Sequence, residues 1–158
     1  MILKEEQKDL FTVPKDYALV HCISADVAMG AGIAKEFTNL GVKDYILHQF
    51  PTPINVTGIC LRAYNTNWKC ICNLVTKQHY YNKPSYSALK KSLLHLKYLI
   101  KSDNEYFREI DINHNKIITK LAMPRIGCGL DRLKWDKVKV IIEEVFTDTD
   151  IEILVCYL

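Results

Sequence analysis

The chain has 158 residues and a mass of 18.3 kDa, the size of one domain with a full hydrophobic core. Its composition, 49% hydrophobic and 25% charged, is typical of a soluble globular protein, and no apolar run is long enough to cross a membrane. The net charge of +3 is mild and no long basic block occurs, which argues against a plain nucleic-acid-binding module.

The first residues and the cysteines indicate a compartment. The charged segment Met1–Phe11 has no apolar signal core. The six cysteines include no CxxC pair and no His/Cys cluster of zinc-binding spacing, so no metal site is predicted and reduced thiols are the simplest account. We therefore expect a monomer in the cytoplasm, or in the nucleus if the source is eukaryotic.

The first half of the chain contains two strand candidates. Tyr17–Ile23 is a continuous apolar run, as expected of a strand buried on both faces. It leads to Gly30–Phe37, which has the pattern of a glycine turn that opens a helix. Trp68–Val75 is the second strand candidate, and the spacing of Cys70 and Cys72 places both on one face of it.

The clearest helix is predicted to begin after the turn at Asn82–Pro84. Ser85 is its expected N-cap, and apolar residues recur at three- and four-residue steps from Tyr86 to Ile100. The next segment, Ser102–Asn115, is rich in charge and asparagine, and we expect a solvated loop there.

The rest of the chain continues the alternation. Ile117–Met123 is a predicted strand, Trp135–Phe146 a helix and Asp150–Tyr157 a β-branched strand. Strands that alternate with helices predict an α/β fold whose mostly parallel sheet is covered on both faces. In such sheets, ligands bind beyond the carboxyl ends of the strands.

Two glycine-rich segments, Met29–Ile33 and Ile126–Asp131, each follow a predicted strand. Glycines allow close approach of the backbone to a phosphate, and the free N–H groups of a helix start attract anions. Either segment alone is more often an ordinary tight turn. The pair, at equivalent positions of the sheet, favours two backbone cradles for a diphosphate.

Several segments carry a resemblance to a known family: His21–Ser24, Met29–Ala34, Thr76–Lys77, Lys83–Pro84 and Met123–Leu133. The chain resembles the macrodomains, and more narrowly their terminal ADP-ribose protein glycohydrolase and O-acetyl-ADP-ribose deacetylase branch. The likeness runs from Asp9 to Leu158 and implies one macrodomain over residues 1–158, a three-layer α/β/α fold with a mixed, mostly parallel sheet. Between Phe37 and Trp68 little specific likeness is found.

The resemblance implies ADP-ribose as the ligand and assigns its contacts. Asp9 and Leu10 would hold the adenine, with the carboxylate accepting from the exocyclic amine. Ser24 would contact the ligand beside the first loop, and Leu158 would lie near it. The two phosphate loops would comprise Gly30, Ala31, Gly32 and Ile33, and Arg125, Ile126, Gly127, Cys128, Gly129 and Leu130.

The resemblance also makes Lys77 the nucleophile and Asp131 its acid/base partner. A lysine is an ammonium at neutral pH, so it must lose a proton before it can attack the anomeric carbon of the distal ribose. Asp131 would move that proton and help to release the sugar. His79 is a weaker candidate for proton transfer.

The implied function is removal of ADP-ribose from carboxylate esters, either Glu- or Asp-linked ADP-ribose on proteins or O-acetyl-ADP-ribose, or from DNA bases. Neither a metal nor an organic cofactor is implied, because the lysine replaces an activated water. ADP-ribosylated protein or DNA would be the partner, and no membrane partner is expected. A non-catalytic ADP-ribose reader and an ADP-ribose 1″-phosphate phosphatase remain alternatives.

Overall fold

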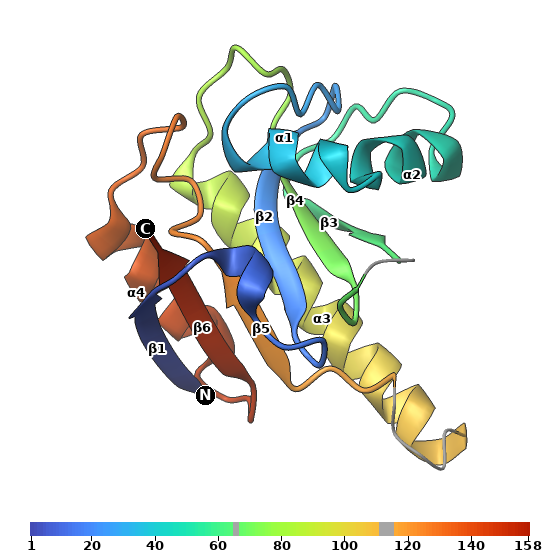
Figure 1. Ribbon diagram of the computed structural model, residues 1–158, viewed down its shortest axis with the longest axis vertical. Helices are drawn as coiled ribbons and strands as arrows, with labels where there is room; N and C mark the ends of the chain where they lie inside the picture. Colours follow the sequence, from blue (N-terminus) through green and yellow to red (C-terminus); the bar gives the residue numbers. More distant parts are fainter. Residues whose placement is uncertain (65–66, 111–115) are drawn as a thin grey trace.

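The computed structural model describes residues 1–64, 67–110 and 116–158, and within them six strands form a single sheet (Figure 1). The order across the sheet is β1-β6-β5-β2-β4-β3; every neighbouring pair is parallel except β3 and β4. The strands are β1 (Ile2–Gln7), β2 (Ala18–Ser24), β3 (Ile59–Ala63), β4 (Ile71–Lys77), β5 (Lys120–Met123) and β6 (Glu152–Tyr157).

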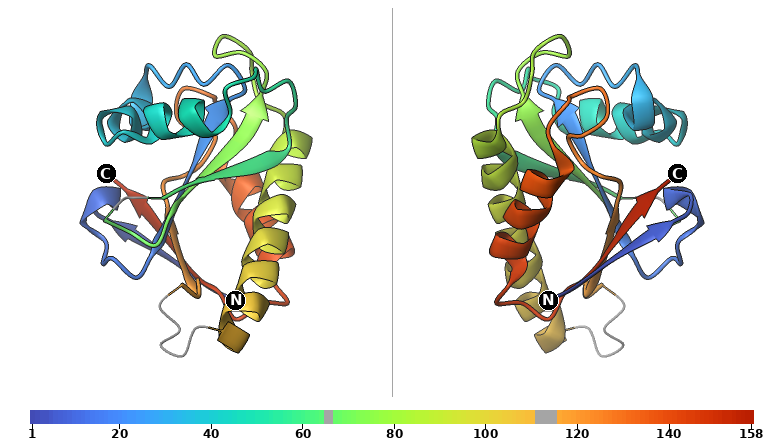
Figure 2. Two further views of the ribbon diagram at one scale, coloured as in Figure 1. Left: turned by 90° about the vertical axis from the view of Figure 1, so that its right-hand side faces the viewer. Right: turned by 90° about the vertical axis from the view of Figure 1, so that its left-hand side faces the viewer.

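Helices cover both faces of the sheet, which gives the expected three layers. One face carries the 3₁₀ helix η1 (Leu10–Thr12) with α1 (Gly32–Asn39) and α2 (Val42–Gln49). The opposite face carries α3 (Tyr86–Ile110) and α4 (Trp135–Phe146), as the two side views of Figure 2 show. No helix within the described ranges has the length and apolar character needed to span a bilayer.

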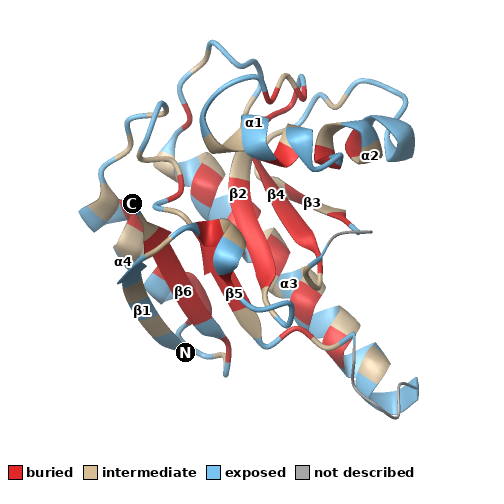
Figure 3. Cartoon of the chain, viewed as in Figure 1, coloured by how far each residue is buried: buried red, intermediate tan, exposed pale blue. Residues whose placement is uncertain are grey.

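The central strands have apolar side chains on both faces because each face supports its own core. Along β2, Ala18 and Val20 pack toward α3 and α4, whereas Leu19 and Ile23 pack toward α1 and α2. Figure 3 shows this burial running through β2, β4, β5 and β6, while the edge strand β1 is half exposed. The continuous apolar runs read from the sequence are therefore the buried strands.

One buried polar pair interrupts the core on the α1 side. His21 lies on β2, stacks on Phe37 with 3.9 Å between ring centroids, and places Nε2 2.6 Å from Oδ1 of Asn73. Since the Asn73 amide nitrogen donates to the carbonyl of Leu61, its oxygen must accept from an Nε2–H of His21. Nδ1 of His21 is buried and has no hydrogen-bond partner among the residues that the structure describes, and desolvation lowers the pKa of His21 to about 4.

The prediction of a loop over Ser102–Asn115 is wrong for its first nine residues, because α3 continues to Ile110. Asn104 holds this last part of the helix: its side chain donates to the carbonyl of Ile118 at 2.7 Å and accepts from the Ile118 amide at 2.9 Å. Asp103 pairs with Arg62 of β3. The polar residues that suggested a solvated loop are thus the residues that dock the helix, and residues 111–115 lie outside the described ranges.

Candidate active site

The two glycine segments follow β2 and β5, which are adjacent in the sheet, so both lie at the same carboxyl edge. They border a cavity of about 930 Å³, a volume within the range of nucleotide-sized ligand sites. The cavity is also bordered by the end of β4 and the loop that follows it. The predicted placement of two cradles around one site is therefore found.

The first loop is held in an unusual backbone conformation. Val27 and Met29 have φ values of 54° and 45°, in the left-handed region that β-branched and bulky residues rarely adopt. Two side chains hold the loop from the helices behind it: Thr38 of α1 donates to the carbonyl of Met29 at 2.8 Å, and Lys43 of α2 donates to that of Ala28 at 3.0 Å. Such strain is typical of functional loops that the surrounding structure constrains.

The second loop needs glycine at one position and leaves space at another. Gly127 has a φ of +72°, and a Cβ there would lie 2.9 Å from Cδ1 of Leu133, so a side chain would distort the loop. Gly129 has an ordinary φ, and a Cβ would meet nothing within 4 Å. Because Gly129 borders the cavity, a side chain there would enter ligand space and not the protein core.

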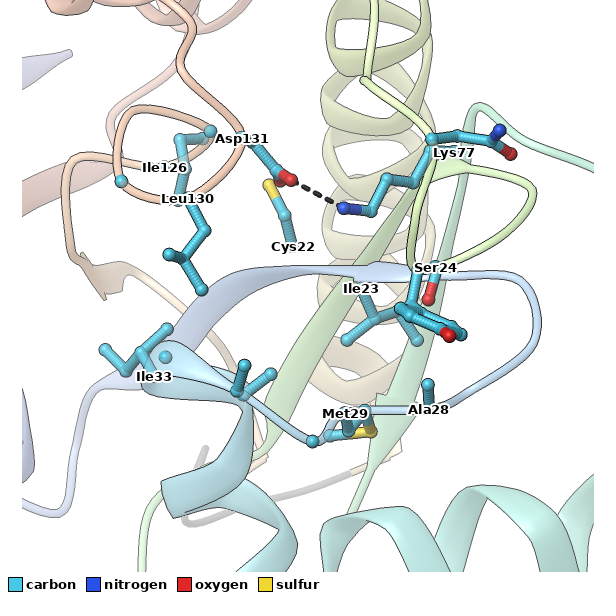
Figure 4. Close-up of a pocket in the computed structure, with 18 of the residues that line it drawn as sticks. Cys22, Ile23, Ser24, Ala28, Met29, Ile33, Lys77, Ile126, Leu130 and Asp131 are labelled. Carbon is cyan, nitrogen blue, oxygen red and sulfur yellow. Dashed lines mark hydrogen bonds and ion pairs between the residues drawn. The ribbon is translucent and has the colours of Figure 1, made fainter.

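Lys77 and Asp131 meet inside this cavity. Lys77 is the last residue of β4 and Asp131 lies in the second loop; Nζ and Oδ1 are 2.6 Å apart (Figure 4). Their side chains are only 14% and 18% exposed. The β2–β4 register shifts between Ile23 and Ser24, and such irregularities change where side chains at a strand end point. Asp131 thus forms an ion pair with Lys77. It does not cap the following helix, because the N-cap residue of α4 is Lys134.

The two thiols near the ion pair are poorly suited to compete as nucleophiles. Cys22 lies beside Asp131 (Figure 4), and desolvation together with the charge of Asp131 raises the pKa of the Cys22 thiol well above its ordinary value. Desolvation raises the pKa of Cys128 to about 11. Thiols attack as thiolates, so neither Cys22 nor Cys128 is suited to act as a nucleophile at neutral pH.

A second cavity, of about 560 Å³, adjoins the first and shares Ile33, Pro124, Arg125 and Gly129 with it. It lies between η1, the second loop and the end of β6. Asp9 borders it and uses Oδ1 to accept from the Phe11 amide at 2.9 Å, which fixes η1. The Arg125 guanidinium lies 4.5 Å from the centroid of the Tyr157 ring.

Apart from the weaker candidate His79, every predicted site residue borders one of these cavities. The first cavity takes Lys77, Asp131, Ser24, Gly30, Ala31, Gly32, Ile33, Arg125, Ile126, Gly127, Gly129 and Leu130. The second takes Asp9, Leu10, Cys128 and Leu158, again with Ile33, Arg125 and Gly129. Two joined cavities of this size suit a long ligand with two ends, one beside η1 and the other beside Lys77.

The sequence reading missed aromatic residues at the rim. Tyr80 and Tyr81 border the first cavity and are 66% and 67% exposed. The His79 ring stacks on Tyr81 at 5.1 Å, and Tyr80 meets Tyr81 edge-on at 5.3 Å. The adjacency of these rings in the Gln78-His-Tyr-Tyr string was the signal available in the sequence. His79 itself is exposed and does not border either cavity.

Comparison with known proteins agrees with this geometry. ADP-ribose glycohydrolase OARD1 of Bos taurus is 41% identical over 149 residues, 93% of this chain and 86% of the bovine protein. The protein of the same name from Homo sapiens is 40% identical over the same shares. The solved macrodomain of Mycobacterium tuberculosis DarG superposes with a TM-score of 0.73 at 20% identity, covering 99% of this chain and 98% of that one. No family model matches the chain.

Proposed function

Because the chain belongs to the macrodomain family, in the branch of ADP-ribose glycohydrolase OARD1, we propose that it binds ADP-ribose and hydrolyses the bond that joins the distal ribose to an acceptor. The observation that carries the proposal is the Lys77–Asp131 pair, which lies in the same cavity as both glycine loops. The loops supply backbone N–H groups for a diphosphate. The pair supplies a nucleophile and a proton acceptor at one end of the ligand.

In the proposed reaction, Asp131 takes a proton from the Lys77 ammonium across their 2.6 Å contact. The free amine attacks the anomeric carbon of the distal ribose, a C–N bond forms, and the acceptor leaves with the electrons of its C–O bond. Opening of the ribose ring gives an imine between Lys77 and the sugar. Water adds to the imine, the C–N bond breaks, and ADP-ribose leaves with the lysine restored.

A carboxylate ester is the acceptor bond that we favour. A carboxylate is a stable leaving group, so the step needs no metal and little acid assistance. Glu- and Asp-linked ADP-ribose on proteins and the acetyl ester of ADP-ribose belong to this class. Chemistry by Lys77, Asp131 and water accounts for all of them.

ADP-ribose on a DNA base is the second candidate, and the rim aromatics favour it. Tyr80 and Tyr81 are exposed where the acceptor would leave the cavity, and exposed aromatic rings stack on nucleobases. A protein carboxylate offers no ring for such stacking. The two acceptors can therefore be separated by their dependence on these side chains.

A parallel turnover assay tests the proposal. The protein is incubated with glutamate-linked ADP-ribosyl protein, ADP-ribosylated DNA, O-acetyl-ADP-ribose and ADP-ribose 1″-phosphate, and released ADP-ribose and phosphate are quantified. We expect release from at least one ester or DNA substrate. Binding of ADP-ribose without any turnover would identify a reader, and phosphate release alone would identify a phosphatase.

A further inference from the structure

Asp26 links the first glycine loop to the loop that follows β4, and both of these loops border the active-site cavity. It follows β2 and its carboxylate accepts three hydrogen bonds. Oδ1 accepts from the Ser24 hydroxyl and from the Ala28 amide at 3.1 Å, and Oδ2 accepts from the Tyr80 amide at 2.9 Å. Ser24 and Ala28 border the cavity on the side of the first loop, whereas Tyr80 belongs to the loop after Lys77.

The backbone beside Asp26 also holds the turn that follows Lys77. The Ala25 amide donates to the carbonyl of Lys77 at 2.8 Å, and the Asp26 amide donates to that of Gln78 at 3.1 Å. With the bond from the Tyr80 amide, the Ala25–Asp26 segment contacts three of the four residues from Lys77 to Tyr80. The Ala25–Asp26 segment thus fixes the backbone of Lys77 and of the turn that follows it.

The hydrogen bonds to Asp26 indicate an ionised carboxylate, and the backbone next to it is strained. Desolvation acts to raise the pKa of Asp26, but the hydrogen bonds from Ser24, Tyr80 and Ala28 outweigh it, and the pKa lies below its ordinary value. The next residue, Val27, has its φ at 54°. A β-branched residue keeps such a conformation only where its neighbours impose it.

The bond from Ser24 also determines what Ser24 offers the ligand. A hydroxyl has one proton, and that of Ser24 is directed to Asp26. The Ser24 oxygen can therefore take part in a further hydrogen bond only as the acceptor. Ser24 is thereby set to accept a hydrogen bond from a ligand hydroxyl, such as one on a ribose.

From these contacts we propose that Asp26 is a positioning residue, which fixes Lys77 and the acceptor orientation of Ser24 at the distal end of the ligand; the proposal rests on the proposed function. It acts through its neighbours and does not itself border the cavity. Thr38 and Lys43 hold the glycine loop independently of it, so its removal should affect chemistry more than ADP-ribose affinity.

Asp26→Asn is the informative variant because it keeps the shape of the side chain. An amide has one acceptor oxygen, whereas the native contacts use both oxygens. In one amide orientation the NH₂ group faces the Tyr80 amide, and in the other it faces the Ala28 amide. Either way, two donors oppose each other and one backbone contact is lost.

The kinetic test compares Asp26→Asn with Asp16→Asn. Asp16 pairs with Lys120 at the other end of the sheet. Asp16→Asn therefore makes the same replacement of a carboxylate by an amide, but far from the cavity. We expect kcat of Asp26→Asn to fall by about tenfold to a hundredfold, the size that follows from a misplaced reacting group, with Kd for ADP-ribose within about threefold. A residue that only stabilised the fold would lower Tm and leave kcat per folded molecule unchanged, and that result would overturn the proposal.

Amide hydrogen exchange supplies a readout that needs no activity. In Asp26→Asn, peptides covering residues 24–31 and 76–83 should exchange faster than in wild type, while peptides of α3 and α4 should not change. Asp16→Asn should leave both site peptides as in wild type. Unchanged exchange at both segments in Asp26→Asn refutes the positioning role even if no substrate is turned over, whereas faster exchange with an inactive wild type counts against the proposed function alone.

Discussion

At the scale of single residues, Lys77 is the group whose chemistry can be tested most directly. Lys77→Ala removes the attacking nitrogen, so turnover should drop to near background. Lys77→Arg should do almost the same, because a guanidinium does not lose its proton at workable pH. A lysine that acted only as a positive charge would instead leave the Arg variant substantially active. Lys90→Ala, an exposed lysine of α3, provides the matched control.

Trapping tests the covalent step of the same proposal. Borohydride reduction during turnover should convert the imine into a stable secondary amine, and mass spectrometry should find ADP-ribose on the peptide containing Lys77. Lys83, whose Nζ lies 3.4 Å from the Leu130 carbonyl oxygen at the rim, is the internal control and should carry no adduct. An active Lys77→Arg enzyme without any adduct would favour a water-based mechanism centred on Asp131.

Asp131 is predicted to serve proton transfer more than binding. Asp131→Ala should retain ADP-ribose affinity within about tenfold and lose about 10²–10⁴ in turnover, the usual contribution of a general acid–base group. Calorimetry and steady-state kinetics measure the two effects. Asp136→Ala, an exposed carboxylate in the first turn of α4, should behave as wild type. Normal turnover of the Asp131 variant would remove the assigned role.

At the scale of elements, the second glycine loop can be tested without unfolding it. The structure leaves open space at Gly129, so Gly129→Glu should fold normally. Its carboxylate would enter the space of the diphosphate and repel it, and ADP-ribose binding should be lost in calorimetry. Gly129→Ala adds only a methyl group and should retain affinity within about tenfold. Equal binding by the Glu variant and wild type would show that the loop does not hold the phosphates.

The sequence predicts those elements whose burial produces a pattern. The apolar run of β2 and the periodicity of α3 and α4 follow from complete burial of a face, and the structure confirms these elements. β1 was missed because it is an edge strand whose Lys4, Glu5 and Glu6 reach solvent or surface partners. α2 was missed because only Val42 and Ile46 are buried on it.

The site was predictable to the extent that its residues stand in recognisable strings. The glycine loops, Lys77 and Asp131 are predicted in this way, and the structure brings them to one cavity. Asp26 and Tyr80 were not found, because their relation is a contact between loops that are 54 residues apart. No local pattern encodes a bond of that kind, and only the pairing of β2 with β4 creates it.

At the scale of the whole molecule, His21 links stability to pH. Burial lowers the pKa of His21 to about 4 in the folded state, below its ordinary value of 6.5, so the unfolded chain binds more protons between these limits. Stability is therefore fully present above pH 6.5 and falls as the pH drops toward 4. The loss should reach about 3 kcal/mol in total and about 2 kcal/mol between pH 7 and 5.

Urea denaturation across this pH range measures the effect. His21→Gln should have a lower stability at pH 7, because the stacking on Phe37 is lost, but a flatter dependence on pH than wild type. His48→Gln, at the exposed end of α2, should keep the wild-type slope. If wild type and His21→Gln have the same slope, His21 is not the group responsible.

The pairing of β1 with β6 determines when during synthesis the sheet can be completed. Ile2 aligns with Glu152 and Gln7 with Tyr157, so β1 gains its neighbour only when residues 152–157 have been synthesised. The second cavity is built across the same junction, with Asp9 on one side and Tyr157 on the other. A nascent chain in which both glycine loops have already been synthesised therefore still lacks part of the second cavity. A ligand that occupies both cavities can therefore bind fully only after residues 152–157 have been made.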